Sequence, residues 1–180
     1  AYASGVQSGA AMVMSAFNGL DGIPCTGNKK LLTEILREEM GFDGLTISDW
    51  GAVEELIKMG VARDGAQAAE EALNAGLDME MMSGTFAGNL QELVRAGKVS
   101  QQRLDQAVYR VLRLKNDLGL FENPNRGRNP EKDTAPIPQA HRELARRMAE
   151  ESLVLLENRG QLLPLPKQGK KIALIGPYGN

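Results

Sequence analysis

Residues 45–51 read LTISDWG, and this stretch gives the clearest signal of the chain's architecture. The run Leu45–Asp49 is short and apolar, which is typical of a buried strand. Two similar runs are AMVMSAF at 11–17 and LDMEM at 77–81. The three runs start at residues 11, 45 and 77, so consecutive starts lie 34 and 32 residues apart. This nearly constant spacing predicts a repeated unit of strand and connection.

The segments between the runs have the periodicity of helices. Asn28 is placed to cap the first helix, and Gly41 supplies a left-handed residue at its end. The second segment opens with Asp64 and has Gln67 three residues later, the spacing of a capping box, and Gly76 ends it. Strand and helix in alternation predict parallel strands joined by right-handed crossovers. In the first helix, apolar residues form one stripe at i, i+3 and i+4: Leu31, Leu32, Ile35, Leu36 and Met40.

The repeat length favours one α/β architecture over another. A (β/α)8 barrel has about 250 residues in eight units, or about 31 per unit, and the observed spacings are close to that value. A doubly wound sheet accommodates the same spacing. Three strands cannot close a barrel. The predicted fold is therefore α/β, with residues 1–120 forming the C-terminal part, the last strands and helices, of a (β/α)8 barrel.

The sequence changes character after the third run. Helices are expected over 89–97 and 100–118, the second capped by Ser100, and residues 121–138 are rich in Asn, Pro, Arg and Gly and have no apolar period. A further amphipathic helix is expected to run through Leu144, Met148, Ser152 and Leu155. The run LVLLEN at 153–158 either ends that helix or forms a strand, and periodicity does not decide between them.

The last residues predict the start of a second domain. KIALIG at 171–176 has the composition of a buried first strand. We therefore expect an inter-domain linker with a helix over 121–170, and the truncated first strand of an α/β sandwich domain over 171–180. On this interpretation the chain is a segment of a longer enzyme.

The composition excludes several function classes. Apolar residues make up 42% and charged residues 24%, unlike a disordered chain or a membrane protein. A formal net charge of −2 gives no electrostatic basis for binding nucleic acid or an anionic membrane. A single cysteine, Cys25, and a single histidine, His141, exclude an internal disulfide and a structural zinc site. We expect no metal and no cofactor, and a buried, inert thiol at Cys25.

Two carboxylates are candidates for chemistry. Asp49 ends the second strand, where active sites of parallel α/β proteins lie, and Trp50 follows it. A carboxylate can attack an anomeric carbon, and an indole can stack on a pyranose. Alternatively, Asp49 caps the helix that follows. Asp78, taken as the end of the third strand, either lines the same pocket or fixes the local backbone.

Several stretches together resemble glycoside hydrolase family 3. They are VMSAFNGLDGIP at 13–24, LLTEILREEMGFDGLTISDWGAV at 31–53 and NAGLDMEM at 74–81. HRELARRMAEESLVLLEN at 141–158 is similar to that family's passage into its second domain. The resemblance is strongest to the β-glucosidase and β-xylosidase branch, which has this second domain.

The resemblance implies a retaining, exo-acting β-glycosidase that releases terminal non-reducing β-D-glycosyl residues. Asp49 would be the nucleophile that forms a covalent glycosyl-enzyme. Trp50 would be an aromatic wall of the sugar site, and Met14 would line the subsite of the attacked sugar. Phe17 occupies a position that is often tyrosine, so the hydroxyl that approaches the nucleophile is missing here.

The resemblance also implies what this chain works with. In this branch the acid/base is a Glu of the second domain, beyond Asn180, so the isolated segment is expected to be inactive. The substrate would be a β-glucoside or oligosaccharide, the partner would be the rest of the same enzyme, and a periplasmic or secreted location is favoured over the cytoplasm.

Two other functions compete with this one. The chain could be a catalytically incomplete fragment that serves as a structural or assembly piece with a complementary chain. The ending IGPYGN at 175–180 allows an α/β nucleotide-binding module, although G-x-G-x-x-G is missing.

Overall fold

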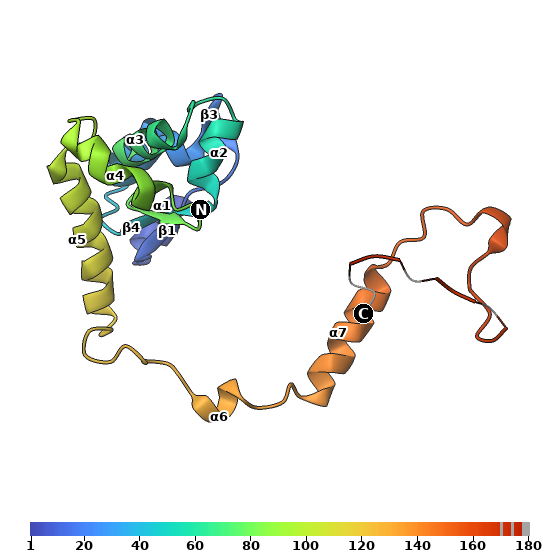
Figure 1. The fold of residues 1–180 in the computed structure, drawn as a ribbon. Helices are drawn as coiled ribbons and strands as arrows, with labels where there is room; N and C mark the ends of the chain where they lie inside the picture. The colour runs from blue at the N-terminus through green and yellow to red at the C-terminus, as the bar shows by residue number, and fades with distance from the viewer. Residues whose placement is uncertain (170, 174, 178–180) are drawn as a thin grey trace. The chain divides into compact units, whose positions relative to one another are not determined.

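A computed structural model describes residues 1–169, 171–173 and 175–177 of the chain (Figure 1). The chain divides into two compact units, Ala1–Gly127 and Arg128–Asn180. The division lies within the segment 121–138 that the sequence predicts as a linker.

The first unit is built on a three-stranded parallel sheet. The strands β1 (Met12–Met14), β4 (Leu45–Trp50) and β5 (Met79–Met81) lie in the order β1-β4-β5. Both outer strands pair with β4 in parallel. The parallel α/β fold is thus confirmed, although β1 and β5 are shorter than the apolar runs that predicted them.

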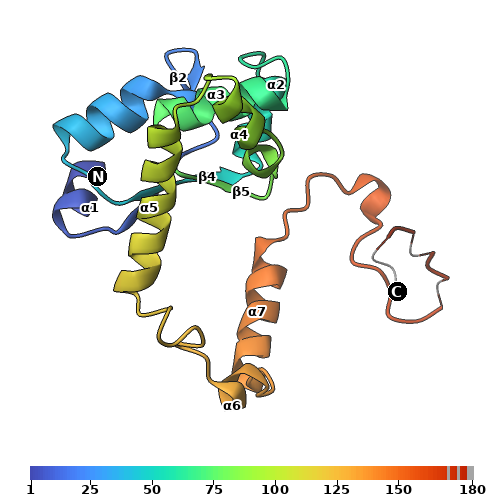
Figure 2. The ribbon, with the colours of Figure 1, turned by 60° about the vertical axis from the view of Figure 1, so that its left-hand side comes forward.

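Helices connect the strands, and α3 and α4 lie on one side of the sheet in both views (Figures 1 and 2). A two-stranded hairpin also follows β1, with Asp21 and Gly22 at φ 53° and 78° in its turn, as a two-residue hairpin requires. The remaining elements of this unit are α1 (Tyr2–Gln7), β2 (Gly19–Leu20), β3 (Ile23–Pro24), η1 (Cys25–Gly27), the π-helix η2 (Lys30–Glu39), α2 (Ala52–Lys58), α3 (Gly65–Ala75), α4 (Thr85–Arg95) and α5 (Gln101–Asp117).

Side-chain caps start three of these helices at the predicted residues. Asn28 Oδ1 accepts the Leu31 N–H at 3.0 Å at the start of η2. Asp64 Oδ1 accepts the Gln67 N–H at 2.8 Å at the start of α3. The Ser100 hydroxyl likewise accepts a backbone N–H at the start of α5. Each cap satisfies one of the amides that an α-helix leaves unpaired at its first turn.

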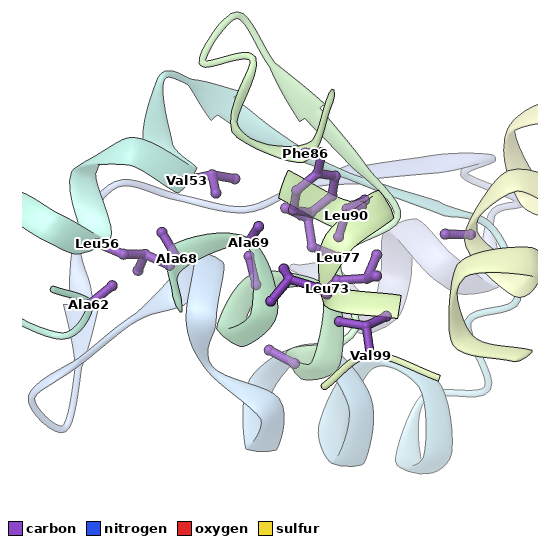
Figure 3. Packing of buried hydrophobic residues seen from close by; sticks show 14 of the residues in the cluster. Val53, Leu56, Ala62, Ala68, Ala69, Leu73, Leu77, Phe86, Leu90 and Val99 are labelled. Atoms are coloured by element: carbon purple, nitrogen blue, oxygen red, sulfur yellow. The ribbon is translucent and has the colours of Figure 1, made fainter. Parts of the chain in front are cut away.

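The core of the first unit forms around α3 (Figure 3). Alanines on α3 allow the neighbouring elements to approach this helix closely. The larger buried side chains in the same cluster are Val53 and Leu56 of α2, Phe86 and Leu90 of α4, and Leu73, Leu77 and Val99.

Gly76 closes α3 against η2 where no other residue fits. Its φ is +121°, and a Cβ there would lie 2.7 Å from Thr33 Oγ1 and 3.2 Å from Leu32 Cβ. The Thr33 hydroxyl donates to the Ala75 carbonyl at 2.7 Å, so it is held in place. The sequence correctly predicts the helix end here, and the close packing adds a second reason for glycine.

A fully buried carboxylate, that of Asp78, joins η2, β4 and α5. Its Oδ2 accepts from Arg37 Nη2 at 2.6 Å and from the Thr46 backbone N–H at 3.1 Å. Its Oδ1 lies 3.1 Å from a guanidinium nitrogen of both Arg103 and Arg110. Asp78 precedes β5, so its assignment to the end of the third strand is wrong. Of the two roles considered, the carboxylate fixes the local backbone.

Three guanidiniums around one buried carboxylate repel one another and lose much of their hydration. Burial lowers the pKa of Arg37 and of Arg103, and Asp78 acts in the opposite direction in both cases. The neighbouring guanidiniums lower these pKa values further. The cations therefore depend on Asp78 for compensation of their desolvation and mutual repulsion.

The second unit buries none of its described residues. It contains α6 (Pro130–Asp133), α7 (Gln139–Ser152) and η3 (Arg159–Gln161). The predicted amphipathic helix is present as α7, but it ends at Ser152 and does not reach Leu155. The run LVLLEN neither extends α7 nor forms a strand, and its residues 153–156 are exposed.

The predicted strand 171–176 falls partly outside the described residues, which omit 170, 174 and 178–180. The described part of 171–177 has no strand, and the strand stays a prediction. Within the described ranges, no helix has both the length and the apolar character needed to cross a bilayer.

We expect Asp78→Asn to lower the free energy of unfolding by about 3–5 kcal/mol, because it leaves three partly buried guanidiniums without their carboxylate. Urea denaturation of the intact protein measures the loss. The matched control is Glu92→Gln, which removes an exposed pair with Arg95 and should leave stability essentially unchanged. Equal effects of the two substitutions would contradict the role given to Asp78.

The Cys25 thiol should react slowly. Its side chain is buried, and burial raises its pKa above the ordinary value. Because the thiolate is the nucleophile, the rate of alkylation should reach half its maximum at a higher pH than the about 8.5 of a free thiol. Iodoacetamide labelling of native and urea-unfolded protein across pH 7–10 tests this. Identical profiles would show that the folded chain does not shield the thiol.

Candidate active site

The carboxyl ends of the three parallel strands meet at one edge of the sheet. Met14 pairs with Ile47, and Trp50 pairs with Met81. The Gly51 N–H donates to the Met81 carbonyl at 2.8 Å, which extends the contact past the end of β4. Figure 2 shows β4 and β5 side by side. This edge therefore brings together Met14, Asp49 and Trp50, three of the four residues expected at the site.

Asp49 presents a partly exposed carboxylate at this edge. Its Oδ1 accepts the backbone N–H of Trp50 at 2.6 Å. Helix α2 starts at Ala52 with Gly51 as its N-cap and has no side-chain cap, so Asp49 does not cap it. In the part of the chain that the structure describes, no cation pairs with Asp49. A carboxylate held by one oxygen, with the other unbonded by these residues, is suited to nucleophilic attack.

Exposed apolar side chains lie at the same edge of the sheet. Trp50 is 63% exposed and Met14 49% exposed, so an indole face and a thioether are open to a ligand. Phe17, 42% exposed, follows β1 by three residues. The strand register does not reach Phe17, so the sheet does not fix its place relative to Asp49. Exposed aromatic faces of this kind stack on the C–H face of a sugar ring.

Two methionines in and directly after β5 are exposed to solvent. Met79 is 41% exposed and Met82 is 67% exposed. Met82 also has a positive φ of 65°. Met79 begins β5 and Met82 directly follows it, so exposed thioethers flank this strand.

Glu80 is an acidic residue beside the site that sequence reasoning missed. Its Oε2 accepts from Ser83 Oγ at 2.6 Å and from the Thr85 N–H at 3.0 Å. Its Oε1 accepts the Phe86 N–H at 3.0 Å. The carboxylate therefore caps α4, which explains why α4 begins at Thr85 rather than at the expected Asn89. Because both oxygens are engaged, Glu80 is not available as a general acid.

The described residues form no cluster of metal ligands. Over 1–169, 171–173 and 175–177, no three His, Cys, Asp or Glu side chains gather as metal ligands.

Comparisons with known proteins identify relatives of this chain. The family model described as "Glycosyl hydrolase family 3 N terminal domain" matches residues 1–114. The periplasmic beta-glucosidase of Salmonella typhimurium is 44% identical over 99% of this chain and 24% of its own length. A xylan 1,4-beta-xylosidase of Xylanibacter ruminicola is 36% identical over 92% of this chain and 19% of its own.

A solved structure gives the same result. The beta-glucosidase from Listeria innocua in complex with glucose superposes with a TM-score of 0.71 and 50% identity, covering 94% of this chain and 23% of that one. The chain thus spans about a quarter of the length of these two beta-glucosidases.

Proposed function

The chain belongs to glycosyl hydrolase family 3, and from this premise we propose that it carries the nucleophile of a retaining, exo-acting β-glycosidase. The activity belongs to the whole protein. The related chains are about four times as long as this one. The substrate is a terminal non-reducing β-D-glucosyl residue of a β-glucoside or oligosaccharide. We propose glucose rather than xylose as the sugar because these relatives are named as beta-glucosidases.

The position of Asp49 carries the proposal. An oxygen of its carboxylate attacks the anomeric carbon, a C–O bond to Asp49 forms, and the bond to the leaving oxygen breaks. An acid protonates that leaving oxygen. Water then attacks the same carbon and gives a proton to the acid's conjugate base, and the Asp49 ester is cleaved. Trp50 stacks on the sugar, and Met14 and Phe17 contribute apolar contacts.

The acid/base is expected outside residues 1–180. Retention requires a second carboxyl group about 5–5.5 Å from the nucleophile, and Glu80 is committed to the cap of α4. This chain therefore supplies the nucleophile and part of the sugar site but needs the rest of the enzyme for turnover. The segment alone is inactive in this proposal, and in that sense it acts as one piece of an assembly.

Two observations support the last strands of a (β/α)8 barrel over a doubly wound sheet. Helices α3 and α4 lie on one side of the sheet (Figure 2). By strand register, Met12, Met14 and Met79 share a face with Ile47, and these three methionines are 41–49% exposed. A doubly wound sheet covers both faces with helices, whereas a barrel turns one face inward.

The location proposed for the enzyme is periplasmic or secreted. It follows from the similarity to the Salmonella typhimurium relative, which is named a periplasmic beta-glucosidase. Fractionation of the producing cell tests this point independently of the chemistry.

Mechanism-based labelling tests the nucleophile. A dinitrophenyl 2-fluoro-β-glucoside transfers its sugar to the nucleophile and releases dinitrophenolate, a leaving group that needs no acid. In the intact enzyme, we expect the fluoroglucosyl group on Asp49, found by mass spectrometry of the peptide that contains LTISDWG. Asp49→Ala should lower kcat/KM by on the order of 10⁴-fold or more.

The control is Glu54→Gln, which changes an exposed carboxylate five residues away on α2 and should keep full activity. Label on another carboxylate, with Asp49→Ala still active, would overturn the assignment.

A further inference from the structure

The ladder between β4 and β5 is irregular just before the carboxylate. Ile47 pairs with Met79, and Trp50 pairs with Met81. Two residues of β4, Ser48 and Asp49, therefore lie opposite a single residue of β5. This is the arrangement of a β-bulge, which leaves backbone groups out of register and redirects a side chain.

The Ser48 side chain occupies the bulge. Ser48 is fully buried at 0% exposure. Its Oγ accepts the Met81 N–H at 2.8 Å and donates to the Asp49 carbonyl at 2.9 Å. The shifted register prevents the Met81 N–H from bonding the Asp49 carbonyl directly. The Ser48 hydroxyl bonds both groups instead.

The Asp49 carbonyl and the Trp50 N–H belong to one planar peptide group. The Ser48 hydroxyl holds the oxygen end of that group. At its other end, the Trp50 N–H donates to Asp49 Oδ1 at 2.6 Å. Because the group is rigid, fixing its oxygen fixes the direction of the N–H, and the N–H in turn orients the carboxylate. The chain of contacts runs from Met81 through Ser48 and the peptide to Asp49.

We propose that Ser48 is a positioning residue for the Asp49 nucleophile. The inference rests on the proposed function, because it concerns the orientation of the carboxylate that attacks the sugar. Ser48 is too buried to touch a substrate, so it acts through the peptide between residues 49 and 50. A misplacement of about 1 Å at a reacting group can slow a reaction by about 100-fold.

Thr46 provides a matched control. It is on the same strand two residues earlier, is 1% exposed, and its hydroxyl bonds Asp78 and the Gly76 carbonyl. Thr46→Val therefore removes a buried hydroxyl of β4 as Ser48→Ala does, but leaves the peptide between residues 49 and 50 held.

The experiment measures the labelling kinetics of the intact enzyme with the dinitrophenyl 2-fluoro-β-glucoside. Ser48→Ala should lower the limiting rate of labelling by about 10–100-fold and change the half-saturating concentration by less than about twofold. Thr46→Val should lower the melting temperature and keep the limiting rate within about twofold of the unmodified enzyme. Loss of thermal stability in both variants with an unchanged limiting rate in both would overturn the proposal.

A second variant keeps the test decisive if Ser48→Ala does not fold. Ser48→Cys conserves the shape of the side chain but has a weak donor and acceptor. Its limiting rate should lie between those of Ser48→Ala and the unmodified enzyme, or clearly below the latter if Ser48→Ala is lost. A limiting rate equal to that of the unmodified enzyme would count against the proposal.

Failure of the proposed function is a separate result. If the unmodified enzyme is labelled at a residue other than Asp49, the nucleophile is assigned wrongly and the role of Ser48 falls with it. If Asp49 is labelled and Ser48→Ala is labelled equally fast, only the positioning role is wrong.

Discussion

The attraction between the Asp78 carboxylate and three guanidiniums is the constraint on which the rest of the first unit depends. It draws Arg37 of η2 and two arginines of α5 to one buried point. The same carboxylate takes the Thr46 N–H, and the Asp78 N–H bonds the Thr46 carbonyl in return. The register of β4 against β5 is thereby set near the start of both strands. The pairing of β4 with β5 nearer the candidate site, including the bulge, follows from this register.

The candidate site combines a rigid support with an open rim. Strand β4 is central and buried for most of its length, and it ends in a carboxylate whose orientation depends on backbone groups. The rim of Trp50, Met14 and the β5 methionines is exposed. Sites built on strands hold their geometry better than sites built on loops. Glu80 belongs to the support, because both of its carboxylate oxygens accept hydrogen bonds at the start of α4.

Local signals allowed much of this fold to be predicted. Caps at Asn28, Asp64 and Ser100 depend on neighbours three residues away, so the sequence displays them directly. That Met14, Asp49 and Trp50 converge follows from the parallel direction of their strands. The partners of Asp78 are 25 to 41 residues away, and no periodicity reports such contacts. The bulge at Ser48 depends on a register between two strands, and the short α2 lacks the length to show a helical period.

The backbone N–H of Trp50, and not its indole, donates the hydrogen bond that orients the Asp49 carboxylate. Every amino acid except proline supplies the same N–H. Under the proposed function, residue 50 can therefore change its side chain, and with it the sugars or aglycones that are bound, without releasing the Asp49 carboxylate. In that proposal the side chain of residue 50 contributes to selectivity and its backbone N–H orients Asp49, so an engineer can change the first and leave the second intact.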